Sequence, residues 1–156
     1  SYQSVPDLIA NRNTLKSAIV KSNAETMITV DGKSMTRAEG IERKNSIKYE
    51  EKLLAEMKKQ YAAATANVKR ENKKIDHKVD EFISTLVGRD FTKQLSTEDQ
   101  EAVEKPYRSK NVFEFFDPIG IFDKILALEA DIDGFKSNID SQLVLSNATS
   151  FIEVDF

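Results

Sequence analysis

The chain has 156 residues, of which 40% are hydrophobic and 31% charged, with a formal net charge of −3; this is typical of one folded globular domain, not of a disordered chain. Because the sequence contains no cysteine, disulfides, thiolate metal sites and a cysteine nucleophile are excluded. Five glycines and three prolines are too few for a turn-rich β fold and favour long helices.

The N-terminal part is predicted to hold a helix followed by a hairpin. Ser4-Val5-Pro6-Asp7 combines a capping serine, a proline in the first turn and an early carboxylate, which predicts a helix over residues 5–21. The segment 26–30 is rich in strand formers, and the Asp31-Gly32 pair that follows is typical of a tight turn. We therefore expect a hairpin over residues 25–36.

The central part is predicted to be one long helix. Thr36-Arg37-Ala38-Glu39 has the form of a capping box, and no proline follows until Pro106. Apolar residues then recur mostly at gaps of three and four, which is typical of a coiled-coil seam. The seam consists of Ile47, Leu54, Met57, Tyr61, Ala64, Val68, Ile75, Val79, Phe82 and Leu86. This pattern predicts a helix over residues 37–86.

The C-terminal part is predicted to contain two further helices and a strand. Ser96 begins a short helix over residues 97–105, which ends before Pro106. An irregular or extended segment follows, and Asp117-Pro118 begins a helix over residues 118–145 in the favoured order of cap and proline. The chain then ends in a strand over residues 150–156.

An internal repeat connects the two ends of the chain. Residues 22–30 and 146–154 are identical at five of nine positions and both begin Ser-Asn-Ala. Each copy is predicted to end a helix and start a strand, so the two strands would share one sheet. The helices before the copies would then lie antiparallel to the N-terminal half of the long helix.

We therefore expect a mainly α fold, an antiparallel helical bundle around one long coiled-coil-like helix, with a small β-sheet from 25–36 and 150–156, in a single domain 1–156. Because residues 118–145 reach only about 42 Å along the long helix at 1.5 Å per residue, the C-terminal third of the seam is expected to be uncovered. An exposed apolar seam predicts a homo-oligomer.

No catalytic machinery is visible in the sequence. His77 is the only histidine and lies in a lysine-rich helical stretch away from any nucleophile motif, where a solvated surface residue is expected. Asp76 and Asp80 beside it make a poor metal site. No phosphate loop, zinc signature or dinucleotide fingerprint occurs. We therefore expect a protein that is not an enzyme, with no metal and no cofactor.

The segment 105–116 combines aromatic and basic side chains, a mixture able to stack a planar base and pair a phosphate. Alternatively, its phenylalanines fill the core between helices while the charges face water. As ligand-binding candidates we take, in this segment, Tyr107, Arg108 and Lys110, and near the sheet, in second rank, Arg12, Arg37 and Arg43.

Charge and hydropathy limit the partners and the location. Residues 37–86 hold 12 Lys and Arg against 9 Asp and Glu, a smaller basic excess than a nucleic-acid footprint requires, so charge complementarity between helices is favoured. No stretch approaches the ~20 apolar residues of a membrane span, and the N-terminus lacks the pattern of a signal peptide. We expect a cytoplasmic protein without membrane or nucleic-acid contact.

The assembled pattern resembles a group of small helical proteins of tailed phages and, more distantly, bacterial proteins labelled septicolysin. The resemblance rests on Asn11-Arg12-Asn13, on the turn 31–36 leading into Glu42-Arg43-Lys44, and on the last Ser-Asn-Ala-Thr segment. It implies a helical oligomer encoded by a phage and acting in the host cytoplasm, and it carries over no active site.

Two functions fit these expectations. In the first, the oligomer sequesters a small anionic, nucleotide-derived ligand, such as a host immune signal, between subunits. In the second, it is a scaffold or assembly factor that binds a virion or host protein through the end of the long helix. The segment 105–116 favours the first, and the uncovered seam favours the second.

Overall fold

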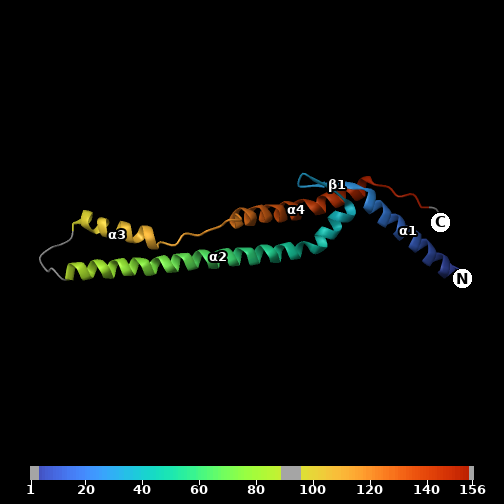
Figure 1. The fold of residues 1–156 in the computed structure, drawn as a ribbon. Helices are drawn as coiled ribbons and strands as arrows, with labels where there is room; N and C mark the ends of the chain where they lie inside the picture. Colours follow the sequence, from blue (N-terminus) through green and yellow to red (C-terminus); the bar gives the residue numbers. More distant parts are fainter. Residues whose placement is uncertain (1–3, 89–95, 155–156) are drawn as a thin grey trace. The chain divides into compact units, whose positions relative to one another are not determined.

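The fold is mainly helical, as predicted. A computed structural model describes residues 4–88 and 96–154, apart from the side chains of residues 86 and 87. The order of elements is α1 (Ser4–Glu25), β1 (Met27–Val30), β2 (Lys33–Thr36), α2 (Arg37–Gly88), α3 (Thr97–Asn111) and α4 (Ile121–Thr149) (Figure 1). The chain divides into two compact units, one of Ser1–Ala55 with Asp123–Phe156 and one of Glu56–Phe122, which we call unit 1 and unit 2.

The long helix α2 begins at the predicted capping box. The Thr36 amide donates to Glu39 Oε2 at 2.6 Å, and the Glu39 amide donates to Thr36 Oγ1 at 3.1 Å. The hydrogen bond from the Thr36 amide lowers the pKa of Glu39, because it favours the charged carboxylate. The helix then runs for 52 residues to Gly88, two residues beyond the predicted end.

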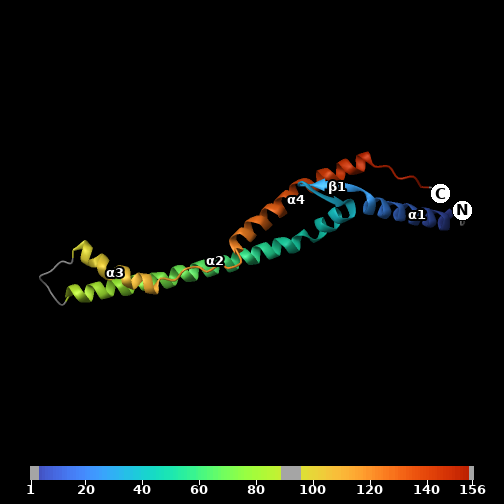
Figure 2. The same cartoon turned by 45° about the horizontal axis from the view of Figure 1, so that its top comes forward.

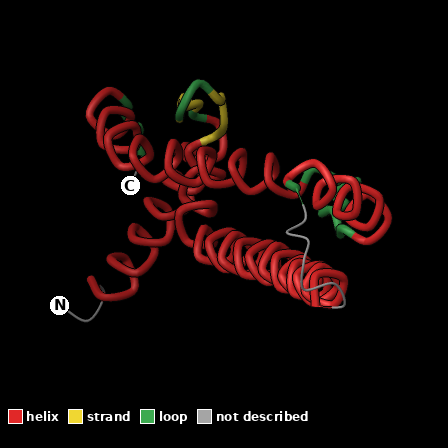
Figure 3. Tube along the Cα trace, turned by 90° about the vertical axis from the view of Figure 1, so that its left-hand side faces the viewer, coloured by secondary structure: helices red, strands yellow, loops and turns green. Residues whose placement is uncertain are grey.

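The predicted hairpin is present. Strands β1 and β2 pair antiparallel, with Met27 opposite Thr36 and Val30 opposite Lys33, and Figure 3 shows them in yellow beside the helices of unit 1. Asp31 and Gly32 both have positive φ, at 49° and 74°, as the two central residues of a type I′ turn require.

The predicted third strand is wrong for the part of the chain that can be described. The sheet has two strands, residues 150–154 form no strand, and residues 155–156 lie outside the described residues. The repeat does not break either helix, because α1 and α4 both continue through Ser-Asn-Ala, to Glu25 and Thr149. Both copies of the repeat therefore lie in the last turns of a helix, and a strand follows only the first copy.

The core of unit 1 lies between the hairpin and α4. Its buried members are Ile28, Val30, Phe135 and Ile139, each contributing roughly 1.5–3 kcal/mol by burial. Ion pairs join α4 to the first part of α2, with Lys44 2.5 Å from Asp140 and Lys136 2.5 Å from Glu51. The order of these pairs shows that the two helices run antiparallel, as predicted.

Gly40 allows this close packing. A Cβ atom at this position would lie 2.9 Å from Ile28 Cδ1 and 3.0 Å from Ile139 Cδ1, closer than side-chain carbons approach one another. Glycine at this point of α2 therefore permits the hairpin and α4 to reach the helix backbone.

Helix α1 does not pack as predicted. It buries no residue, and Val20 is 68% exposed. Figures 1 and 2 both show α1 leaving the other elements of unit 1 toward the N-terminus. Its apolar positions are interrupted, because Arg12 follows Leu8 by four residues and precedes Leu15 by three, which places a charge in the middle of the apolar face. The prediction that this helix lies antiparallel against the N-terminal half of the long helix is therefore wrong.

In unit 2, α3 is longer than predicted and lies beside α2 (Figures 1 and 2). It continues past Pro106 to Asn111, although proline removes one helix hydrogen bond. Arg108 bridges this point, because it donates to Glu104 one turn back and to Asp76 of α2. The predicted end at residue 105 and the irregular segment after it are therefore corrected as far as Asn111.

The C-terminal part of the α2 seam is covered within the chain, contrary to expectation. Ile75 is 6% exposed and Val79 3%. The pocket beside Ile75 is lined by Tyr107, Lys110, Asn111, Val112 and Phe113, so α3 and the residues after it lie against this part of the seam. Phe82, in contrast, is 53% exposed, and the Leu86 side chain lies outside what is described. The uncovered seam from which the oligomer was predicted is thus reduced to its end.

The start of α4 is displaced from its predicted position. The helix begins at Ile121 instead of Pro118, and Asp117 Oδ2 accepts the Ile121 amide at 2.7 Å. The intervening Gly120 has a φ of 61°, which glycine adopts without strain. Asp117 therefore caps the helix across a turn.

No helix among the described residues is both long enough and apolar enough to cross a membrane.

Candidate ligand-binding sites

The predicted ligand-binding residues belong to two separate groups. Arg12, Arg37 and Arg43 are in unit 1, whereas Tyr107, Arg108 and Lys110 are in unit 2. Each group is therefore a separate candidate, and the chemistry of each depends on whether its positive charges already have acidic partners.

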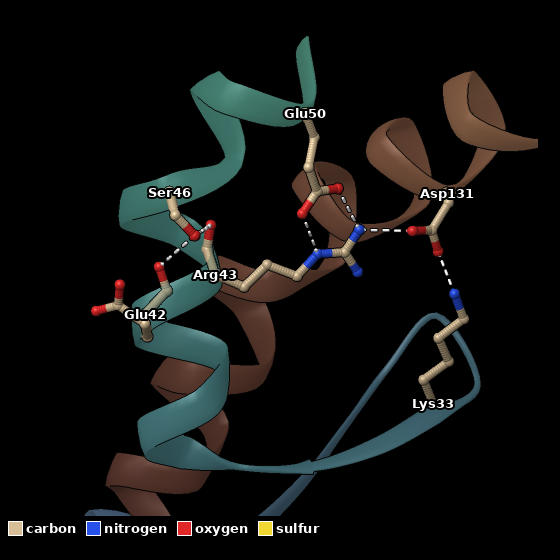
Figure 4. A network of polar contacts seen from close by, with 6 residues as sticks. All are labelled: Lys33, Glu42, Arg43, Ser46, Glu50 and Asp131. Carbon is tan, nitrogen blue, oxygen red and sulfur yellow. Dashed lines mark hydrogen bonds and ion pairs between the residues drawn. The ribbon is translucent and has the colours of Figure 1, made fainter. Parts of the chain in front are cut away.

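Arg43 is neutralised inside unit 1. Its Nε donates to Glu50 at 3.2 Å, and its Nη2 donates to Glu50 at 2.8 Å and to Asp131 at 2.6 Å (Figure 4). The guanidinium carbon also lies 4.4 Å from the centre of the Phe135 ring. Lys33 of the hairpin completes the network through Asp131. Arg43 thus joins α2, α4 and the hairpin, and its charge is not free for a ligand.

The pKa values in this network follow from its contacts. Glu50 and Asp131 raise the pKa of Arg43, because hydrogen bonds to carboxylates favour its charged form. Lys33, followed by Arg43, lowers the pKa of Asp131 below its ordinary value of 3.8. Both shifts favour the charged forms of Arg43 and Asp131.

Arg108 is neutralised as well. It pairs with Asp76 and Glu104, and the hydrogen bond that it donates to Asp76, followed by the one that it donates to Glu104, raises its pKa. The guanidinium therefore joins α3 to α2. This arrangement gives Arg108 a structural role, which neither interpretation of the segment 105–116 predicted.

Tyr107 and Lys110 line a pocket of about 400 Å³ between α2 and α3, which we call the α2–α3 pocket. Lys74, Lys78 and Phe113 line it as well. Lys74 is paired with Glu71 at 2.8 Å, but neither Lys78 nor Lys110 has an ion pair with any described residue. This pocket therefore offers two uncompensated ammonium groups.

Asn72 fixes the aromatic side of the same pocket. Its side-chain nitrogen donates to the Phe113 carbonyl, and its side-chain oxygen accepts from the Phe113 backbone amide, both at 2.8 Å. This two-point contact holds the backbone that follows α3 against α2. Lys74 and Lys78 were not among the predicted site residues, although their spacing of four places both on one face of a helix.

Arg37 has a different environment. The residue is 5% exposed, its Nε and Nη2 donate to the Ser146 hydroxyl at 3.1 and 2.7 Å, and its Nη2 also donates to the Ser146 carbonyl at 3.2 Å and to the Ser150 hydroxyl at 2.6 Å. Its Nη1 donates to the Asn23 side-chain oxygen at 3.2 Å. Every one of these acceptors is uncharged.

The internal repeat explains how these acceptors come together. Asn23 belongs to the first Ser-Asn-Ala copy and Ser146 to the second, and both copies lie in the last turns of their helices. The two copies therefore meet at the Arg37 guanidinium. The prediction that they meet in one sheet is wrong.

The remaining candidates are exposed. Arg12 donates to its neighbour Asn13 at 3.4 Å and has no ion pair with another described residue. His77 is exposed. Among the described residues, no group of three or more His, Cys, Asp or Glu side chains is placed to hold a metal ion.

No protein-family model matches the chain, and no curated protein or solved structure matches it either. The resemblance to phage proteins and to proteins labelled septicolysin therefore stays a prediction.

Proposed function

We propose that the chain is a non-catalytic, homo-oligomeric binding protein that holds a small anionic, nucleotide-like ligand in the α2–α3 pocket. The observation that carries the proposal is the meeting of Lys74, Lys78 and Lys110 with the rings of Tyr107 and Phe113 in one cavity.

The chemistry of the pocket suits such a ligand. Ammonium groups bind phosphate oxygens as compact point charges, and aromatic rings stack on a planar base, for about 1–3 kcal/mol per base. The volume of about 400 Å³ falls in the ordinary range of small-molecule sites, roughly 300–1,000 Å³. Glu71, the one acidic residue among the described residues that line it, is paired with Lys74, so the ligand would meet little repulsion.

The oligomeric part of the proposal is supported by the apolar surface of α1. This helix exposes Val5, Leu8, Ile9, Leu15, Ile19 and Val20. Exposed apolar side chains in this number on one element are typical of an interaction surface. By the resemblance to phage proteins, the ligand would be a nucleotide signal of the host immune response, held without turnover in the α2–α3 pocket of each subunit.

Calorimetric titration and thermal-shift measurement against cyclic nucleotides and cyclic ADP-ribose isomers test the ligand. A bound ligand stabilises the folded protein by about 2.7 kcal/mol at one hundred times its dissociation constant. Lys78→Glu and Lys110→Glu should each weaken binding at least tenfold, whereas Lys59→Glu, on an exposed position of α2 outside the pocket, should not. Failure of the whole panel to bind, or equal losses in all three variants, would contradict the site.

The alternative function is that of a scaffold which binds a virion or host protein through α2. The exposed ring of Phe82 at the end of the seam favours it. A protein captured by the wild type and lost with Phe82→Ala, together with no ligand from the panel, would favour this function. Light scattering tests the oligomer in either case, and a monomer at micromolar concentration would exclude it.

A further inference from the structure

The Arg37 guanidinium is a buried charge without a charged partner. Only 5% of the residue is exposed, and none of the described carboxylates forms an ion pair with it. Buried charges in proteins are normally paired, because neutral acceptors do not offset the loss of hydration. Arg37 is also the first residue of α2, where the helix dipole disfavours a cation.

The end of α4 offsets this charge only in part. The Ser146 carbonyl, which accepts from Arg37 Nη2 at 3.2 Å, belongs to the last turn of α4, where the free carbonyls amount to about half a negative charge. Arg37 is thus held by uncharged acceptors and by the end of α4, with no ion pair to a described carboxylate.

A pocket of about 430 Å³ lies beside this guanidinium, and we call it the Arg37 pocket. Asn23, Asn147 and Ser150 supply its polar lining together with Arg37, and none of the described residues that line it is acidic. The remaining lining residues are aliphatic: Ile19, Ile41, Leu143 and Ile152. The pocket thus combines one cationic end with aliphatic walls.

Hydrogen-bond donors for an anion are available in this pocket. Arg37 Nη1 carries two N–H groups, of which one donates to the Asn23 oxygen and the other has no acceptor among the described residues. Because the Asn23 oxygen accepts from arginine, the nitrogen of the same amide is a donor. Asn147 has no hydrogen bond from its side chain to any other described residue and supplies a further amide.

We propose that the Arg37 pocket binds a small carboxylate with an apolar tail, such as a medium-chain fatty acid. A monocarboxylate carries the single negative charge that one guanidinium balances, whereas a phosphate dianion would leave a second charge among aliphatic walls. The tail would cover Ile19, Ile41 and Leu143. This site is separate from the α2–α3 pocket and does not depend on the function proposed for it.

Octanoate is the probe, titrated into the full chain by calorimetry, with 1-octanol as the uncharged ligand of the same length. The decisive variant is Asn23→Asp, because it places a carboxylate where an amide oxygen now lies 3.2 Å from Nη1. This change should raise the melting temperature of the free protein and weaken octanoate binding at least tenfold. Asn45→Asp, at an exposed position of α2, should leave octanoate affinity unchanged.

A second variant protects the test against misfolding. Ile152→Glu lies in the segment after α4, outside any helix or strand, and should also weaken octanoate at least tenfold. Lys110→Glu should not change octanoate affinity, which separates this site from the α2–α3 pocket. The proposal is overturned if octanoate shows no saturable binding, if octanol binds equally well, or if octanoate binds Asn23→Asp as tightly as the wild type.

Discussion

Replacing Gly40 by alanine tests whether the hairpin, α2 and α4 meet as closely as the structure places them. In an ordinary helix interior this change stabilises a protein by about 1 kcal/mol, because alanine is the better helix former. At Gly40 the new methyl group would lie 2.9 Å from Ile28 Cδ1 and 3.0 Å from Ile139 Cδ1. Both isoleucines are buried and have little room to move, so overpacking should cost about 1–3 kcal/mol. The net expectation is a loss of about 1 kcal/mol.

Urea denaturation followed by far-ultraviolet circular dichroism measures this change in the free energy of unfolding. Ile139→Val removes one of the two clashing atoms, and alone it should cost about 0.5–1.5 kcal/mol. Combined with Gly40→Ala it should cost less than the sum of the two single changes, with a coupling of about 0.5–1 kcal/mol.

A matched control is available at the other end of α2. A Cβ atom at Gly88 would meet nothing within 4 Å, so Gly88→Ala should change the free energy of unfolding by less than about 0.5 kcal/mol. If Gly40→Ala stabilises the protein, or if its effect is simply additive with that of Ile139→Val, the close approach of these elements is refuted.

Three further changes test other parts of the structure. Because Lys33 lowers the pKa of Asp131 below 3.8, this carboxylate contributes stability that is fully present above its unfolded pKa and is lost as the pH falls through the lower folded value. Asp131→Asn should therefore lower stability at pH 7, and it should make stability fall less steeply as the pH drops below about 4. Thermal melts across a range of pH measure both effects, and an unchanged loss of stability at low pH would contradict the pairing. Thr36→Ala removes the cap of α2 and should cost about 1 kcal/mol in urea denaturation, whereas no loss would mean that the capping box contributes nothing. Ile75→Asp should disrupt unit 2 by at least about 3 kcal/mol because it buries an unpaired charge, while Phe82→Asp, at an exposed ring, should change stability by less than about 0.5 kcal/mol; equal effects in the two variants would show that α3 does not cover the seam.

Local chemistry made the start of α2 and the hairpin predictable. The capping box needs only residues 36–39, and the turn needs only Asp31 and Gly32, whose left-handed conformations follow from their residue types. The length of α2 followed in the same way from its seam and from the absence of proline. These features depend on neighbours in the sequence and therefore need no knowledge of the tertiary fold.

The errors concern contacts between distant parts of the chain. The Ser-Asn-Ala repeat was interpreted through the local preferences of serine and asparagine at helix ends, but its polar side chains are held by Arg37, which lies 14 residues from Asn23 and 109 from Ser146. Pro106 was expected to end a helix. However, Arg108 pairs with Asp76, which is 32 residues away in the sequence, and this contact stabilises the part of α3 that follows the proline.

The same limit applies to the candidate sites. The sequence showed that Arg37, Arg43 and Arg108 are cations near other elements, but it did not show which of them have carboxylate partners. Arg43 and Arg108 each have two, and Arg37 has none among the described residues. Partner identity, which decides between a structural and a ligand-binding role, required the folded arrangement.

Because α1 buries none of its residues, local unfolding of this helix would expose little of the core of unit 1. Most of the stability of a protein helix comes from packing of its apolar face, which α1 lacks, so the helix should unfold locally at a much lower free energy than the hairpin and α4. Trypsin would then cleave after Arg12, Lys16 or Lys21 long before it reaches the core. The rate of that early cleavage would report directly on whether α1 has been covered in solution.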